Sequence, residues 1–152
     1  MPRRELKNGR QVADWLQQLA QSLSQRGEMI LIGSSALLWH AHYRGIAAEL
    51  PEASMDVDPI TSSDEVARIC YDSVIGSEFE KEKGWHVNLM PGSVLNEFPV
   101  DWKNRAVQTE LGFLTLLVPD PKDLLVPKLK RGEPRDIKHW EWAKQIGLIK
   151  EA

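Results

Sequence analysis

The chain has 152 residues, 42% of them apolar and 27% charged, and this balance suits one globular domain spanning residues 1–152. Its formal net charge of -3 gives no basic field for binding nucleic acid regardless of sequence, although a local basic groove could still exist on an acidic protein. The composition therefore argues against a dedicated DNA-binding protein.

The cysteine content and the N-terminus indicate the compartment. Cys70 is the only cysteine, so neither an intramolecular disulfide nor a thiolate zinc cluster can form. Polar residues follow Arg3 and Arg4 where a signal peptide needs an apolar run, and no segment approaches the roughly 20 apolar residues of a membrane span. We therefore expect a cytoplasmic protein with no membrane partner.

The chain begins with a predicted helix, a strand and a second helix. Apolar residues at helical spacing predict an amphipathic helix over 9–26, with Asn8 as its N-cap and Gly27 as its stop. The apolar run 29–32 predicts a strand, and after a tight turn residues 36–43 predict a helix. The first helix is expected to cover one face of a sheet.

The middle of the chain predicts a loop, a strand and a helix. Residues 45–53 contain glycine, proline and several small residues, which is typical of a loop. Residues 54–58 predict a strand that ends at Pro59, because proline cannot donate to a sheet ladder. Residues 64–71 predict the helix that follows.

The second half predicts consecutive strands and a helical end. The predicted strands are 85–90, 106–111 and 114–118, and the predicted helices are 120–130 and 135–146, each after a proline-containing turn. The whole order predicts an α/β or α+β domain in which helices flank a mixed sheet.

Two carboxylates stand close together in the predicted strand 54–58. Asp56 and Asp58 are two residues apart, so their side chains leave the same face and could converge on one hard cation, for which magnesium is the natural candidate. Spacing alone favours the simpler interpretation, a pair of solvated acids that closes a strand before Pro59.

A glycine-serine turn precedes the second helix. Gly33 allows close backbone approach, and the helix start at Ser34 and Ser35 offers unpaired N–H groups to phosphate oxygens. An ordinary turn with a serine N-cap explains the same residues equally well. The spacing fits neither a Walker loop nor a dinucleotide-binding fingerprint.

Several segments follow one another in a meaningful order over residues 28–142. They are Ile32-Gly33-Ser34, the helix 36–44, Ser54-Met55-Asp56-Val57-Asp58, Pro99–Arg105, and Pro121–Leu129 with Arg135-Asp136. In this order they resemble the nucleotidyltransferase superfamily, and in particular the small abortive-infection-type (AbiEii-like) members and their relatives.

The resemblance implies a nucleotidyltransferase-like fold and roles for individual residues. Asp56 and Asp58 would hold Mg²⁺, and Lys128 would approach phosphate or organise the site, so these three are the expected catalytic residues. The reaction implied is in-line attack by a substrate hydroxyl on the α-phosphorus of a nucleoside triphosphate, with release of pyrophosphate.

The resemblance also implies a nucleotide-binding set. Gly33, Ser34 and Ser35 would hold the triphosphate, with Arg135 and Asp136 supporting the site from the last helix. Without the resemblance, Asp136 is explained as an acid that suits the helix dipole in a first turn. In the same way, the cluster of Lys128, Lys130 and Arg131 is explained as a solvated helix end.

Three features depart from the pattern of the superfamily. The stretch before Asp56 is long, so the predicted loop 45–53 is expected to protrude over or beside the site. Asn88 stands where many active relatives carry a third carboxylate, and a neutral amide cannot act as a general base. Glu97 or Asp101 could substitute for that carboxylate. His139 stands where another aspartate is frequent.

Two hypotheses follow. The first is a magnesium-dependent nucleotidyltransferase that uses a nucleoside triphosphate to modify an RNA or protein acceptor, as the toxin of a toxin–antitoxin pair with an antitoxin partner. The second is a catalytically inactive nucleotide-binding or protein-interaction domain of the same fold. Asn88 is the main support for the second.

Overall fold

Two β-sheets organise residues 6–54 and 56–149, the part of the chain that the computed structural model describes. The larger sheet has the strand order β5-β4-β2-β7-β6. Its strands are β2 (Gly27–Ile32), β4 (Asp56–Ile60), β5 (His86–Val87), β6 (Val107–Leu111) and β7 (Leu114–Val118). The central strand β2 is antiparallel to β4 and parallel to β7, which confirms the predicted mixed sheet.

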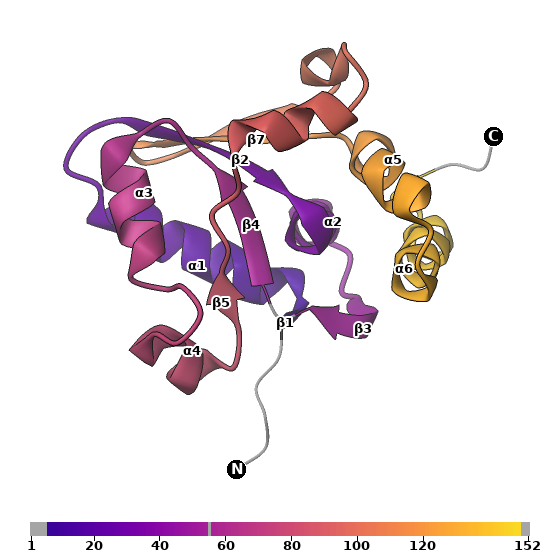
Figure 1. Cartoon of the computed structure of the whole chain (residues 1–152), viewed down its shortest axis with the longest axis horizontal. Coiled ribbons are helices and arrows are strands. Elements are labelled where there is room, and N and C mark those ends of the chain that lie inside the picture. Colours follow the sequence, from indigo (N-terminus) through magenta and orange to yellow (C-terminus); the bar gives the residue numbers. More distant parts are fainter. Residues whose placement is uncertain (1–5, 55, 150–152) are drawn as a thin grey trace.

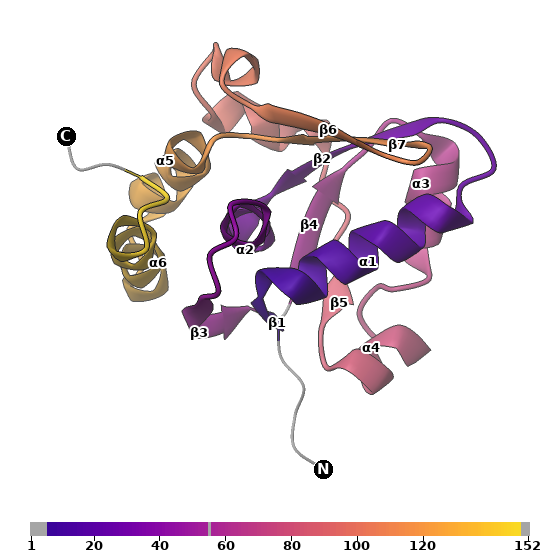
Figure 2. The same cartoon turned by 180° about the vertical axis from the view of Figure 1, so that it is seen from behind.

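One face of the sheet carries most of the hydrophobic core. Helices α1 (Gly9–Ser22) and α2 (Gly33–Tyr43) lie behind the sheet in Figure 1 and in front of it in Figure 2. Beneath them, Leu31, Val57 and Leu116 are completely buried. Helix α3 (Asp64–Tyr71) packs at the start of the same face, because Val66 lies against Gly27. We call this side the helix-covered face.

The opposite side, the open face, carries the alternate residues of the same strands. Asp58 lies opposite Ile32 in the register of β4 and β2. Because the two strands run antiparallel, the end of β2 lies beside the beginning of β4. The turn after β2 is therefore brought next to the acid pair of β4.

Two helices follow the sheet and complete the surroundings of the turn. Helix α5 (Pro121–Arg131) and helix α6 (Pro134–Gln145) pack against each other, and α5 also contacts α2 (Figure 1). A buried hydrogen bond of 2.7 Å joins Nε2 of His40 in α2 to the carbonyl of Pro119, just before α5. Burial lowers the pKa of His40 to about 4, so this link between α2 and α5 is made by a neutral ring.

The predicted first helix is confirmed at its start and is too long at its end. Asn8 and Gln11 form a capping box, with the Asn8 side chain accepting from the Gln11 amide at 3.1 Å. The helix ends at Ser22 rather than near residue 26, because the amides of Ser24 and Gln25 donate to the Glu65 carboxylate of α3. A contact between distant residues thus ends the helix before Gly27.

The predicted loop 45–53 is wrong over most of its length. Strand β3 (Glu49–Ser54) pairs antiparallel with β1 (Leu6–Asn8) and packs against α6. Proline is tolerated in β3 because, among the described residues, β1 is its single neighbouring strand. Side chains are described for residues 45–51 of this segment, and none of them lines the site pocket described below, so this part of the segment does not cover the site.

Pro59 does not end its strand. It pairs with Leu31 inside β4, and its carbonyl accepts a hydrogen bond of 2.8 Å from the amide of Met90. Strand β5 pairs with β4 only at Asp56 and Val57, so the missing proline donor falls beyond that ladder.

Three short helices were not predicted, and one predicted strand is shorter than expected. The short helices are α4 (Glu78–Lys83), η1 (Gly92–Glu97) and η2 (Trp102–Asn104). Strand β5 occupies only two residues of the predicted 85–90. Among the described residues, no helix combines the length and apolar character needed to cross a membrane.

Candidate functional site

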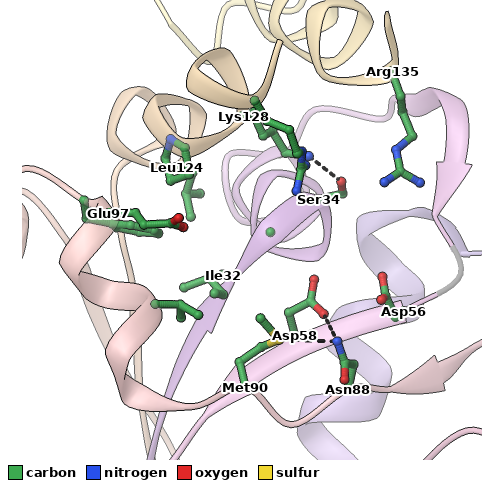
Figure 3. A pocket seen from close by; sticks show the side chains of 15 residues that line it. Ile32, Ser34, Asp56, Asp58, Asn88, Met90, Glu97, Leu124, Lys128 and Arg135 are labelled. Atoms are coloured by element: carbon green, nitrogen blue, oxygen red, sulfur yellow. Dashed lines mark hydrogen bonds between the residues drawn. The ribbon is translucent and has the colours of Figure 1, made fainter. Parts of the chain in front are cut away.

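A pocket of about 240 Å³ opens where the turn after β2, the start of β4 and helices α5 and α6 meet (Figure 3). Its lining combines a polar end and an apolar end. The lining residues are Ile32, Gly33, Ser34, Asp56, Asp58, Asn88, Met90, Val94, Glu97, Phe98, Leu124, Pro127, Lys128, Arg131 and Arg135.

The turn at the bottom of the pocket requires glycine. Gly33 has a φ of 75°, a conformation that other residues rarely adopt. A Cβ at this position would also collide with Oδ2 of Asp58. Gly33 therefore lets the carboxylate approach the first turn of α2, where backbone N–H groups lack helical partners. The alternative of an ordinary turn with a serine N-cap is wrong, because Ile32 is the N-cap residue and makes no side-chain capping bond.

Asp56 and Asp58 lie on one face of β4 and both line the pocket, as their spacing predicts. Burial raises the pKa of Asp58 to about 7, and the charge of Asp56 adds to the rise. A hydrogen bond from Asn88, together with the charges of Lys128 and Arg131, opposes this rise without cancelling it. The Asp58 carboxylate is therefore easier to protonate than an exposed aspartate, despite these cations.

Asn88 does lie beside the acid pair, where a third carboxylate was considered. Its Nδ2 donates to Oδ1 of Asp58 at 3.3 Å. Glu97 lines the same pocket from η1, but Figure 3 shows it on the far side from Asp56 and Asn88. Asp101 is absent from the lining and pairs with Arg105 at 2.8 Å. Within the described part of the chain, no three histidine, cysteine or acidic side chains gather as a metal-binding group.

A buried polar network supports the other side of the pocket. Nζ of Lys128 lies 3.0 Å from Oγ of Ser34 and 3.2 Å from Nδ1 of His139, and the same nitrogen of His139 lies 3.2 Å from Oγ of Ser34. Lys128 is 6% exposed and His139 is completely buried. Burial lowers the pKa of Lys128, whereas the charge of Asp136 opposes the decrease.

Asp136 anchors this network without lining the pocket itself. Its carboxylate accepts two hydrogen bonds from Arg131, at 2.7 and 2.8 Å, and lies 3.6 Å from Nζ of Lys128. The hydrogen bonds from Arg131 lower the pKa of Asp136 to about 2. This completely buried carboxylate is therefore ionised at neutral pH and holds two cationic side chains in place.

The structure brings together most of the residues predicted from the sequence. Gly33, Ser34, Asp56, Asp58, Lys128 and Arg135 all line the pocket. Arg135 extends from α6 toward Asp56 (Figure 3). Two residues of the predicted nucleotide-binding set, Ser35 and Asp136, do not line the pocket and are completely buried. Ser35 donates to the Ile32 carbonyl at 3.0 Å and accepts from the Asp58 amide at 3.4 Å, so it joins the turn to β4.

Sequence reasoning missed the apolar end of the pocket and the role of His139. Met90, Val94 and Phe98 come from the irregular segment around η1, whose residues follow no period. No local pattern indicates that His139 lies beside Ser34, because the two residues are 105 positions apart in the chain. Arg131 was visible only as part of a basic cluster.

The donor set fits a hard divalent cation. Two carboxylates on one strand supply oxygen ligands, while triphosphate oxygens and water can complete the shell. A bound cation would favour the ionised form of Asp58, which burial and, to a smaller extent, the charge of Asp56 disfavour. Arg135 and the first turn of α2 also line the pocket, where they could hold phosphate oxygens of a ligand that shares the cation.

Comparison with known proteins identifies a family for this chain. A family model described as a nucleotidyltransferase of unknown function (DUF6036) matches residues 10–151. No curated protein and no solved structure matches the chain. The match covers the sheet, the turn at Gly33, the acid pair and helices α5 and α6. The chain therefore belongs to the DUF6036 family of nucleotidyltransferases of unknown function.

Proposed function

We propose that the protein is a magnesium-dependent enzyme that transfers a nucleotidyl group from a nucleoside triphosphate to a hydroxyl group of an RNA or protein acceptor. The main support is the arrangement of one pocket, in which Asp56 and Asp58 face a cationic side formed by Lys128, Arg131 and Arg135 across the Gly33-Ser34 turn. Opposite charges on the two sides suit a metal-bound polyphosphate.

In this mechanism the protein mainly positions and polarises. Asp56 and Asp58 would hold the magnesium ion, which when bound offsets phosphate charge and orients the reacting oxygens. The amides of the first turn of α2 and the guanidinium of Arg135 would hold the triphosphate tail, so that the α-phosphorus faces the acceptor.

The transfer of a nucleotidyl group to RNA or protein suits a toxin that inactivates a component of its own cell. Such a protein would act in the cytoplasm and would be kept inactive by an antitoxin. The ordered segments that resemble AbiEii-like proteins support this role, and the single buried thiol of Cys70 suits a reducing compartment.

A direct test incubates the protein with magnesium and each of the four labelled ribonucleoside triphosphates, using cellular RNA and cellular protein as acceptors. We expect label to enter one acceptor, with release of pyrophosphate. The Asp56→Ala/Asp58→Ala variant should lose this labelling by about a hundredfold or more, because it lacks both proposed metal ligands. Thermal unfolding of both proteins checks that the variant remains folded.

One observation favours a second candidate, a nucleotide-binding domain without transferase activity. Asn88 occupies the position next to Asp58 where a carboxylate would serve as a base, and it can only contribute an amide. Calorimetry that shows magnesium-dependent nucleotide binding, combined with no labelled product, would support this candidate. Absence of both binding and labelling would contradict both.

A further inference from the structure

The ammonium group of Lys128 is surrounded by acceptors of the protein itself. Ser34 Oγ lies at 3.0 Å, His139 Nδ1 at 3.2 Å and Asp136 Oδ1 at 3.6 Å from Nζ. A lysine ammonium has three N–H donors and no acceptor. Two donors can therefore be used in hydrogen bonds and the third can face the ion-pair partner, which leaves no N–H that must be directed at a ligand.

His139 sits beneath Ser34 and Lys128 as a neutral acceptor. Because the Lys128 ammonium can only donate, the Nδ1 atom that it contacts must carry a lone pair, and the proton of a neutral ring is then on Nε2. This tautomer is assigned from the hydrogen-bond network. The single lone pair of Nδ1 can accept one strong hydrogen bond, either from Lys128 or from Ser34.

The hydroxyl hydrogen of Ser34 can therefore be donated in one of two directions. Its oxygen accepts from Lys128, while its hydrogen can go to Nδ1 of His139 or into the pocket that Ser34 lines. When Lys128 occupies Nδ1, only the pocket remains for this hydrogen. An acceptor such as a phosphate oxygen would then receive it, in addition to the amides of the first turn of α2.

We propose that Lys128 and His139 are positioning residues that act through Ser34, which donates its hydroxyl hydrogen to a phosphate oxygen of the bound polyphosphate. This inference rests on the proposed function, since it requires a polyphosphate ligand in the pocket. It assigns Lys128 a different task from direct contact with phosphate, and it gives His139 a role at the site.

The first experiment is a double-mutant cycle between Ser34 and Lys128. Dissociation constants for magnesium tripolyphosphate and for the four magnesium nucleoside triphosphates are measured by calorimetry for wild type, Ser34→Ala, Lys128→Met and the double variant. We expect each single variant to weaken binding about tenfold, and the double variant to weaken it by little more than that. A direct Lys128–phosphate contact, or an effect of its charge through space, would persist without the Ser34 hydroxyl and give about a hundredfold in total.

Arg135 provides the matched control. Its guanidinium reaches the pocket from α6, and neither Ser34 nor Lys128 is its hydrogen-bond partner in the described structure. The losses from Ser34→Ala and Arg135→Met should therefore multiply, in contrast to those from Ser34→Ala and Lys128→Met.

A second pair of variants tests His139. His139→Asn places an amide oxygen close to the position of Nδ1, whereas His139→Leu fills a similar volume with no acceptor. We expect the asparagine variant to bind tripolyphosphate within about threefold of wild type and the leucine variant to bind it about tenfold more weakly. Thermal unfolding of both variants separates this difference from a common loss of packing. Equal affinity of the two variants would overturn the role of His139.

The outcomes also separate this inference from the proposed function. If wild type binds neither tripolyphosphate nor any of the nucleotides, both the proposed function and this inference fail. If wild type binds them but the losses from Ser34→Ala and Lys128→Met multiply, only this inference fails.

Discussion

The folded protein shifts the pKa values of two neighbouring carboxylates, Asp58 on β4 and Asp136 on α6, in opposite directions. Asp58 accepts a hydrogen bond from the neutral amide of Asn88, and burial raises the pKa of Asp58 to about 7. Asp136 receives two hydrogen bonds from Arg131, which lower its pKa to about 2. The first carboxylate is destabilised in its ionised form and suits an added cation, whereas the second is already balanced and maintains the structure.

The direction of the pKa shift distinguishes an acid that lines the pocket from one that supports it, which position in the chain does not. Both acids were predicted as site residues, yet only Asp58 lines the pocket. When the folded protein disfavours the ionised form of a carboxylate, binding of a cation relieves that cost and is favourable. A carboxylate that is already paired gains little from a further cation. Substitutions on the two sides should therefore change different measured quantities.

The largest effect on stability is expected at Gly33, where the acid side meets the helix. Gly33→Ala should lower the free energy of unfolding by about 3 kcal/mol, because it combines a positive φ with a collision against Asp58. Gly45→Ala is the matched control, since Gly45 has the same φ of 75° and no atom near an added Cβ. We expect it to cost about 1 kcal/mol in urea denaturation. Equal losses would show that the approach of Asp58 does not depend on glycine.

The next effect compares the two carboxylates directly. Asp136→Asn should lower the free energy of unfolding by about 2 kcal/mol at neutral pH, because the folded pKa of Asp136 lies below its unfolded value. The stability that Asp136 supplies is present above about pH 4 and is lost as the pH falls toward about 2. Urea denaturation at pH 5 and pH 8 should therefore show the same deficit for Asp136→Asn at both values.

Asp58→Asn should behave in the opposite way. The folded pKa of Asp58 is raised to about 7, so the wild type loses stability as the pH rises from about 4 to about 7. The amide variant avoids this loss and should be at least as stable as wild type, with a larger advantage at pH 8 than at pH 5. A variant less stable than wild type at pH 8 would contradict the view that Asp58 is held at a cost to folding.

The smallest effect is expected from restoring a third acid. Asn88→Asp should raise nucleotidyl transfer about tenfold at saturating magnesium, because the position beside Asp58 gains a base and a further metal ligand. Without magnesium the same variant should be less stable than wild type, since it adds a like charge. Asn88→Ala serves as the control, because it removes the amide without adding charge. No gain of Asn88→Asp over wild type, or an equal gain in Asn88→Ala, would contradict this expectation.

The sequence predicts the parts of the fold that depend on local pattern. The N-cap at Asn8, the strand before Gly33 and the helices that begin at Pro121 and Pro134 all have local signals, and all are confirmed. The pairing of β1 with β3 was missed because it joins segments about forty residues apart, and sequence period says nothing about such partners. The end of α1 depends on Glu65, which is equally distant.

The site shows the same division. Asp56 and Asp58 follow from a period of two, and Gly33 from the need for a tight turn. The contacts of Lys128 with Ser34 and His139 join three helices, so no local pattern contains them. The family resemblance supplied Lys128, but nothing in it indicated that His139 lies beside Ser34 and Lys128.

The open face of the sheet has a consequence for how such proteins diversify. Buried residues such as Leu31, Val57 and Leu116 lie on the helix-covered face, and none of these three lines the pocket. A change at the exposed Glu97 therefore alters the pocket wall with little repacking of the main core, whereas Phe98 belongs to that core. Natural variation in this wall can produce new acceptor preferences on an unchanged scaffold, and it is there that functional differences between family members should be sought.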